Sequence, residues 1–269
     1  MDILHAAVLG ILQGLTEILP ISSSAHLILV PWLLGWPESG LTFDVGLHVG
    51  TLIALCVYFR RDIAYLLSDA VTGLREGFGS QTSRLPFYII AGTVPAAIVG
   101  KTMEEPIEAF FRGSHTLIAV LLIAFGLLLA LADTTGPKRW RMDRVDLRGA
   151  LLIGLAQCLA LVPGVSRSGI TITAALFLGF TRDTAARFSF LLSLPIVAGA
   201  GILKMGELAR HGIPAGELAP LLTGMATSAV SGYLGVALLL RLVQRYSLYP
   251  FVWYRLLAGG AVLAYLFTR

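Results

Sequence analysis

The sequence predicts an all-α integral membrane protein: a polytopic helical bundle with an inverted-topology repeat, two re-entrant helix hairpins and about six full transmembrane helices. Its 269 residues are 56% hydrophobic and only 13% charged, with a mean hydropathy of +0.81. A soluble domain normally carries roughly 25% charged residues, so this composition points to lipid. Apolar runs long enough to cross a bilayer recur along the chain, and two proline-broken, hydroxyl-rich segments align without a gap.

Six apolar runs each have about the length that a helix needs to cross a hydrocarbon core. They are residues 43–59, 86–101, 116–132, 185–203, 218–240 and 250–267. Regions 3–35 and 149–180 differ, because each consists of an apolar half, a proline, a hydroxyl-rich turn and a second apolar half. Pro20 and Pro163 interrupt the backbone hydrogen bonding, and the freed polar groups cannot face lipid. Each region is therefore predicted to form a re-entrant hairpin with its broken tip buried in protein.

The two hairpins are copies of each other at an offset of 144 residues. The identical or similar pairs are Gly10 and Gly154, Gln13 and Gln157, Leu15 and Leu159, Ser22 and Ser166, Ser24 and Ser168, Ala25 and Gly169, and Gly35 and Gly179. A shorter echo relates residues 92–100 to residues 224–232. We predict a single membrane domain over residues 1–269, with one repeat at about 1–135 and the other at about 145–269. Because each repeat has one hairpin and three spans, the two repeats must have opposite orientations.

The positive charges predict the orientation of the chain. The loops 60–84, 133–148, 181–187 and 241–249 together carry thirteen Lys and Arg residues. The opposite side carries five, namely Lys101, Arg112, Lys204, Arg210 and Arg269. The positive-inside tendency places the first set in the cytoplasm. Both termini then face outward, and the two hairpin tips meet near the middle of the membrane.

Other chemistry is excluded or weakly signalled. Cys56 and Cys158 have no metal-type or redox spacing. The pI of about 9.3 does not indicate nucleic acid, because no basic run with interleaved aromatic residues occurs. Arg255 falls within a predicted span, where it should snorkel or pair with another group.

The first hairpin carries a carboxylate and a hydroxyl cluster. Gln13 and Glu17 are four residues apart and share a helix face just before Pro20. A carboxylate at membrane depth is costly and is a functional candidate, although a structural partner of Arg167 would look the same. A helix-packing amide would equally explain Gln13.

Serines 22 to 24 follow the break in this hairpin. Helix capping explains one of the residues Ser22, Ser23 and Ser24, but not all three. Ser23 and His26 are three apart, a spacing that predicts a hydroxyl beside an acid/base group. The alternative is that His26 only packs. Asp44 and His48 share a face of the first full span and could reach the same site.

The second hairpin carries an arginine in an anion-binding context. Arg167 lies between Ser166 and Ser168 at the start of a half-helix, where a planar guanidinium, hydroxyls and backbone N–H groups can surround one anion. We assign Gly169 and Thr171 to the same substrate-binding face. The structural alternative is an arginine that only balances Glu17.

These motifs resemble those of the bacterial undecaprenyl-diphosphate phosphatases of the bacitracin-resistance type, over essentially the whole chain. The motifs that carry the resemblance are Gln13-x-x-x-Glu17, Pro20 to His26, Pro163 to Thr171, Phe188 to Pro195, and Pro250-Phe-x-x-Tyr254-Arg255. Many members have Glu in place of Gln13, and Thr-Gly in place of Ser24-Ala25. The first departure leaves one carboxylate where the family commonly has two.

The resemblance implies hydrolysis of undecaprenyl diphosphate to undecaprenyl phosphate and inorganic phosphate, in the recycling of the cell-wall lipid carrier for peptidoglycan synthesis. It also implies a multi-pass protein of the bacterial cytoplasmic (inner) membrane, a site open to the outer face, a homodimer, and a divalent cation. We expect Mg²⁺, with Ca²⁺ as an alternative.

The expected mechanism follows from phosphoryl transfer, which needs positioning and charge neutralisation. Arg167 should bind the diphosphate, with the serines 22, 24, 166 and 168 around it. Glu17, helped by Gln13, should hold the cation, since one carboxylate plus substrate oxygens suits magnesium. His26 should act as acid or base toward Ser23 or toward water. The sequence leaves open whether Ser23 forms a phosphoenzyme.

Two other functions compete with this interpretation. An inverted repeat with broken helices is also the design of a polyprenyl-phosphate flippase or transporter that does not hydrolyse its substrate. The acid-phosphatase type of enzyme uses a histidine nucleophile, and it needs a second histidine and an aspartate after its Ser-Arg pair. We set it aside because the only histidine after Ser166 and Arg167 is His211, and no Asp lies on a matching helix face.

Overall fold

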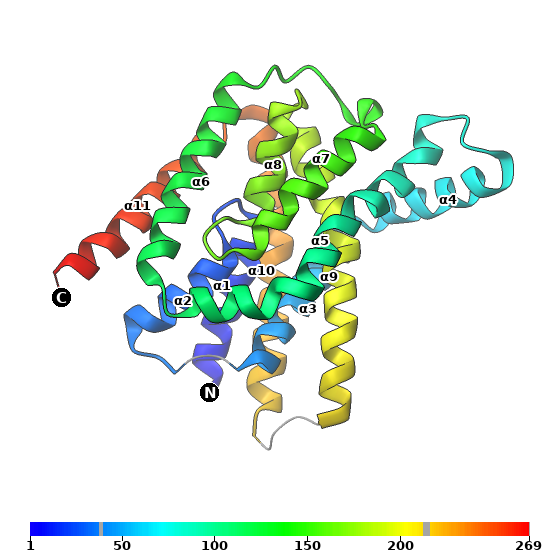
Figure 1. Cartoon of the computed structure of the whole chain (residues 1–269). Coiled ribbons are helices and arrows are strands. Elements are labelled where there is room, and N and C mark those ends of the chain that lie inside the picture. The colour runs from blue at the N-terminus through cyan, green and yellow to red at the C-terminus, as the bar shows by residue number, and fades with distance from the viewer. Residues whose placement is uncertain (38–39, 212–215, 269) are drawn as a thin grey trace.

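A computed structural model describes residues 1–37, 40–211 and 216–268 (Figure 1). Apart from one isolated bridge between Trp140 and Phe180, the regular structure of these residues is helical, which confirms the predicted all-α class. The elements are α1 (Ile3–Ile18), α2 (Ser23–Leu34), α3 (Leu41–Tyr58), α4 (Arg60–Glu76), α5 (Gln81–Arg112), α6 (His115–Thr135), η1 (Met142–Arg144), α7 (Leu147–Gln157), η2 (Cys158–Leu161), α8 (Arg167–Phe177), α9 (Arg182–His211), α10 (Leu218–Arg245) and α11 (Tyr249–Phe267).

Five helices are long and apolar enough to cross a membrane, which makes the chain a multi-pass membrane protein. They are Gln81–Met103 of α5, His115–Thr135, Arg182–Leu203 of α9, Leu218–Arg245 and Tyr249–Phe267. Each overlaps one of the predicted spans. The sixth predicted span, 43–59, corresponds to α3, which is 18 residues long. By length and composition α3 qualifies as a membrane span only when it is joined with α4, from which it is bent by 75°.

Helix α4 corrects the prediction that residues 60–84 form a loop. Its apolar residues follow a helical period: Ile63 and Leu66 pack against the main core, while Leu67, Val71 and Leu74 are exposed. Asp62 in the first turn and Arg75 in the last turn suit the helix dipole. Figure 1 shows α4 projecting sideways from the other helices, consistent with its bend from α3.

Both predicted hairpins are broken at the predicted prolines. The first is α1, a turn at residues 19–22, and α2; the second is α7 and η2, a turn at residues 162–166, and α8. The repeat-equivalent residues Ser22 and Ser166 have the same unusual backbone, with φ of 76° and 74°. L-residues rarely adopt this left-handed region, so such strain usually marks a functional position.

Each hairpin packs against a helix of the other half of the chain: α1 lies mainly against α10, and α7 mainly against α5. Glycines permit both contacts. A Cβ on Gly10 would lie 2.4 Å from the carbonyl oxygen of Gly224, and a Cβ on Gly154 would lie 1.9 Å from that of Gly92. These close approaches are typical of membrane helices. Gly10 and Gly154 are equivalent in the repeat, as are Gly92 and Gly224.

The main core surrounds the second hairpin, with Phe59, Phe188 and Phe190 fully buried between the helices. At one end of the bundle, Arg182 at the start of α9 pairs with Asp133 of α6 at 2.5 Å. The same carboxylate accepts a hydrogen bond from the backbone N–H of Leu248, just before α11, at 3.0 Å. This contact fixes α6, α9 and α11 far from the hairpin tips. Arg269, counted above among the outer charges, lies outside the described residues.

Candidate active site

The two hairpin tips touch each other directly. The backbone N–H of Gly164 donates to Ser22 Oγ at 3.1 Å, and Ser168 Oγ donates to the carbonyl of Leu19 at 3.1 Å. Each bond joins the break of one hairpin to the break of the other. Residues about 144 positions apart in the sequence therefore form one buried polar centre.

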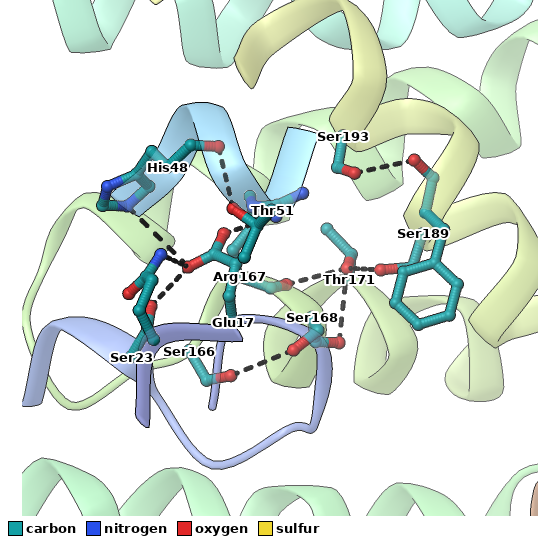
Figure 2. Close-up of polar contacts among 12 residues, drawn as sticks. Glu17, Ser23, His48, Thr51, Ser166, Arg167, Ser168, Thr171, Ser189 and Ser193 are labelled. Carbon is teal, nitrogen blue, oxygen red and sulfur yellow. Dashed lines mark hydrogen bonds and ion pairs between the residues drawn. The ribbon is translucent and has the colours of Figure 1, made fainter. Parts of the chain in front are cut away.

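The carboxylate of Glu17 is the hub of this centre, as Figure 2 shows. Arg167 Nη2 lies 2.6 Å from Glu17 Oε1, and Ser23 Oγ donates to Glu17 Oε2. Gln13 Nε2 donates to Oε2 at 3.4 Å, and His48 Nε2 lies 3.8 Å from the same oxygen. Glu17 is only 8% exposed, so its charge is compensated inside the protein by the guanidinium and hydroxyl around it.

The half-helices direct their N-termini toward the two breaks. Ser23 is the first residue of α2 and Arg167 is the first residue of α8. Ser166 caps α8, because its Oγ accepts a hydrogen bond from Gly169 N–H at 3.1 Å. The side chains that reach Glu17 thus come from positions where backbone N–H groups and the positive end of the helix dipole also favour an anion.

The remaining predicted binding residues form a hydroxyl network behind this hub. Ser22 Oγ is 3.3 Å from Ser24 Oγ, and Ser166 Oγ is 3.3 Å from Ser168 Oγ. Thr171 turns toward α9 instead, where its hydroxyl is 2.6 Å from Ser189 Oγ (Figure 2). The structure therefore brings Ser22, Ser24, Ser166 and Ser168 to the breaks, whereas Thr171 links α8 to α9.

His26 has different partners from those that its spacing predicts. Its Nδ1–H donates to the carbonyl of Ser22 at 2.6 Å, and Tyr254 Oη–H donates to its Nε2 at 2.7 Å. The carbonyl can only accept, so it fixes the tautomer of the neutral ring. Ser23, expected beside His26, bonds Glu17 instead. The reason is that α2 turns His26 toward α11 while its first residue faces the hub.

Three further residues, His48, Tyr254 and Arg255, lie near the tips. His48, expected to share a helix face with Asp44 and to reach the site, does reach it: its Nε2 lies 3.8 Å from Glu17 Oε2, and its Nδ1–H donates to the carbonyl of Asp44 at 2.9 Å. Tyr254 was part of a motif without a role. Of the two alternatives for Arg255, pairing is confirmed and snorkelling is not: the side chain is 0% exposed and bonds to backbone carbonyls. The charge inside a predicted span was the signal that marked Arg255, but not its partners.

The donors around Glu17 fit a divalent cation only in part. Among the described residues, no group of three or more His, Cys, Asp and Glu side chains could hold a metal ion. Gln13 is fully buried, however, and its Oε1 has no hydrogen-bond partner. An unpaired amide oxygen beside a carboxylate suits Mg²⁺ or Ca²⁺ whose other ligands are substrate oxygens and water.

The fold and this centre define a class: a polytopic helical membrane protein in which two broken helices bring a carboxylate, a guanidinium and hydroxyls to one buried point. Comparison with known proteins gives the family. The family model described as "Bacitracin resistance protein BacA" matches residues 6–261, and the chain belongs to this family.

Curated relatives agree along the full length of the chain. It is 96% identical to a protein named undecaprenyl-diphosphatase from Geobacter sulfurreducens, over 100% of both chains. Proteins of the same name from Geobacter metallireducens and Moorella thermoacetica are 72% and 48% identical, again over 100% of both chains. The resemblance inferred from the sequence motifs is therefore confirmed.

Proposed function

We propose that this protein is an undecaprenyl-diphosphatase, which hydrolyses undecaprenyl diphosphate to undecaprenyl phosphate and inorganic phosphate. Its membership of the BacA family and the shared name of its full-length relatives support this function. The structural observation that carries it is the contact of Arg167 and Ser23 with one buried carboxylate, Glu17.

Arg167 binds the diphosphate in this proposal. Its side chain is 16% exposed while Nη2 holds Glu17, and we infer that the other N–H groups of the guanidinium meet the diphosphate. Phosphate oxygens accept bidentate hydrogen bonds from arginine, and the N–H groups at the starts of α2 and α8 add further donors. Ser166 and Ser168 support this position through their contacts at the breaks.

Ser23 is the nucleophile in this proposal, because its hydroxyl is already oriented by a hydrogen bond to Glu17 Oε2. Its Oγ attacks the distal phosphorus, its proton passes to Glu17, and the bond from that phosphorus to the bridging oxygen breaks to release undecaprenyl phosphate. Water then hydrolyses the phosphoserine and restores the hydroxyl. In the alternative route, a water oriented by Ser23 attacks the same phosphorus directly. Trapping of a labelled phosphoserine separates the two routes.

His26 has a positioning role in this scheme. Both of its ring nitrogens are engaged, one with Ser22 and the other with Tyr254, so it holds the start of α2 against α11. Its Nε2 could accept a proton from the reacting group only if it first lost its hydrogen bond from the Tyr254 hydroxyl. We therefore place the proton acceptor at Glu17.

Glu17 and Gln13 Oε1 are the groups that would hold a Mg²⁺ or Ca²⁺ ion. When bound, the cation neutralises charge on the diphosphate. The buried, unpaired oxygen of Gln13 is the observation that supports this assignment.

The membrane arrangement is also proposed. We infer an inverted repeat with two re-entrant hairpins in the bacterial cytoplasmic membrane, with both termini and the site facing outward. The equivalent glycine contacts of the two halves and the thirteen-to-five charge distribution support it. A homodimer, which the family resemblance implies, is tested by cross-linking in native membranes.

The flippase alternative has one specific observation in its favour, the equivalent packing of α1 on α10 and of α7 on α5. The chemistry is not equivalent, however. Glu17 corresponds to Leu161 in the second copy, so this carboxylate is not duplicated. This asymmetry favours a single reaction site over two alternating binding states.

Phosphate release by the purified protein from undecaprenyl diphosphate tests the function, measured with Mg²⁺, with Ca²⁺ and with EDTA. We expect release with a divalent cation and little with EDTA. Folded protein that releases no phosphate would contradict the function. Movement of a fluorescent polyprenyl phosphate across proteoliposomes by such inactive protein would establish the transporter instead.

A further inference from the structure

Arg255 of α11 is the one fully buried arginine among the described residues, and its surroundings are unusual. Its Nε–H donates to the carbonyl of Leu122 at 2.9 Å. Its Nη1 donates to Pro20 and Val165, both at 3.2 Å, and its Nη2 donates to Gly164 at 2.7 Å and Val165 at 3.2 Å. A guanidinium has five N–H groups, and all five directions are used by backbone carbonyls.

The carbonyls that Arg255 binds are those that the two breaks set free. Pro20 lies in the turn of the first hairpin, and Gly164 and Val165 lie in the turn of the second. At membrane depth an unsatisfied carbonyl is costly, because the hydrocarbon offers it no hydrogen-bond donor. One side chain therefore solvates both breaks at once, and reaches Leu122 of α6 as well.

The surrounding sequence makes room for this guanidinium. A Cβ on Gly169 of α8 would lie 3.0 Å from Arg255 Nη1, and a Cβ on Gly126 of α6 would lie 3.2 Å from Arg255 Cβ. Both distances are tighter than ordinary side-chain contacts, so the two glycines keep the space for the arginine. For Gly169, which the sequence analysis assigned to substrate binding, the nearest atom to an added Cβ belongs to Arg255.

The geometry points to Arg255 as the positioning residue that locks the two hairpin tips together and so sets the relative placement of Ser23 and Arg167. It is not a catalytic residue, because its five N–H groups are occupied and none remains for a phosphate oxygen. Its effect passes through the peptide planes of the breaks.

The peptide planes explain how this effect reaches the site. The C=O and N–H groups of a trans peptide point in opposite directions, and no cis peptide bond occurs in the described chain. Because the carbonyl of Val165 points at Arg255, the N–H of Ser166 points away from it. Arg255 thereby fixes the direction of an amide at the start of α8, beside Arg167. Such fixed donors stabilise transition-state charge without reorganisation.

Arg255→Met and Arg255→Lys test this role, because methionine removes the charge and lysine keeps it without the planar fork. A loosened tip should lower kcat more than it raises KM, since the donors act mainly in the transition state. We expect kcat to fall by about 100-fold, the scale of a 1 Å misplacement, with a KM change below about 3-fold. Arg182→Lys is the control, as this arginine holds the distant Asp133 and should keep kcat.

A double-variant cycle separates positioning from general destabilisation. Arg167→Lys already impairs one of the groups that Arg255 aligns. In that background Arg255→Lys should therefore lower kcat by a much smaller factor than it does in the wild type. Effects that simply multiply would show that Arg255 acts only by lowering the amount of folded protein. Gly126→Ala, which presses on Arg255 without touching the tips, should give an intermediate loss of kcat.

Hydrogen exchange supplies a readout that does not depend on activity, whereas the kinetic experiments rest on the proposed hydrolysis. In Arg255→Met, exchange should rise at residues 19–24 and 162–168 together, while α9 and α10 keep wild-type exchange. A rise at one break only, or a uniform rise along the chain, would overturn the inference. If the wild type releases no phosphate but exchange still rises at both breaks in Arg255→Met, the proposed function is overturned and the role of Arg255 stands.

Discussion

Ser23 and Arg167 occupy equivalent positions in the internal repeat, and both bind the carboxylate of Glu17 (Figure 2). Each is the first residue of a half-helix that follows a proline-containing break. The two breaks thus place a hydroxyl and a guanidinium at aligned positions of the sequence, next to residues with similar backbone φ. The carboxylate that joins them occurs only in the first copy, since Leu161 replaces it in the second.

The Glu17–Arg167 pair should show strong coupling in stability. Glu17→Ala leaves a partly buried guanidinium without its carboxylate, a loss of about 3 kcal/mol on the scale of broken buried pairs. Removing both groups in Glu17→Ala/Arg167→Ala should restore much of the Tm in detergent but none of the phosphatase activity. A double variant less stable than both single variants would contradict the pairing.

Ser23→Ala should abolish most turnover while the protein stays folded. Ser23→Ala removes the nucleophile, or the hydroxyl that orients the attacking water, so we expect a loss of at least about 100-fold, the scale of a misplaced reacting group. Phosphate release from undecaprenyl diphosphate is the measurement. Ser228→Ala is the matched control, because that buried hydroxyl only donates to the carbonyl of Leu47 between α10 and α3. Equal losses in both variants would rule out the assigned role.

The two equivalent glutamines should respond in opposite ways to replacement by leucine. Gln13 lies beside Glu17, and Gln157 is buried with neither polar side-chain atom paired. Gln157→Leu removes an unsatisfied amide whose burial costs about 1–3 kcal/mol, so it should keep activity and raise Tm. Gln13→Leu should lose activity, with the loss largest at low Mg²⁺. Normal activity of Gln13→Leu at every Mg²⁺ concentration would remove it from the cation site.

Cysteine labelling should reveal the proposed orientation. In a background with Cys56 and Cys158 replaced, Arg141→Cys should react with an impermeant maleimide only from the cytoplasmic side. Gly113→Cys, between α5 and α6, should react only from outside. The basis is the excess of Lys and Arg in the loops on the Arg141 side. The reverse labelling pattern would invert the topology and place the site at the inner face.

Much of the fold could be predicted because lipid imposes a simple rule on composition and length. Five spans and the two broken segments appear where the apolar runs and Pro20 and Pro163 placed them. Helix α4 was missed because its charges, from Arg60 to Arg75, read as a cytoplasmic loop. In α4 charged and apolar residues are interspersed at helical spacing, so the sequence contains no long apolar run.

The site was less predictable than the fold, because its contacts join distant segments. Local spacing placed Gln13 and Glu17 on one face, and the alignment of the breaks indicated that Arg167 would meet them. Local spacing also suggested a contact of Ser23 with His26, but His26 bonds Tyr254, which lies 228 residues away. Backbone carbonyls leave no trace in a sequence pattern, so the partners of Arg255 could not be inferred.

Phosphate release from undecaprenyl diphosphate by Arg167→Ala, beside the wild type at equal amounts of folded protein, tests the account most directly. We predict release by the wild type with Mg²⁺ and a loss of at least about 100-fold in the variant, the scale for removing a principal charge-stabilising donor. Near-normal release by folded Arg167→Ala would show that the second hairpin does not hold the phosphates, and would contradict the central claim that the two tips form one active site.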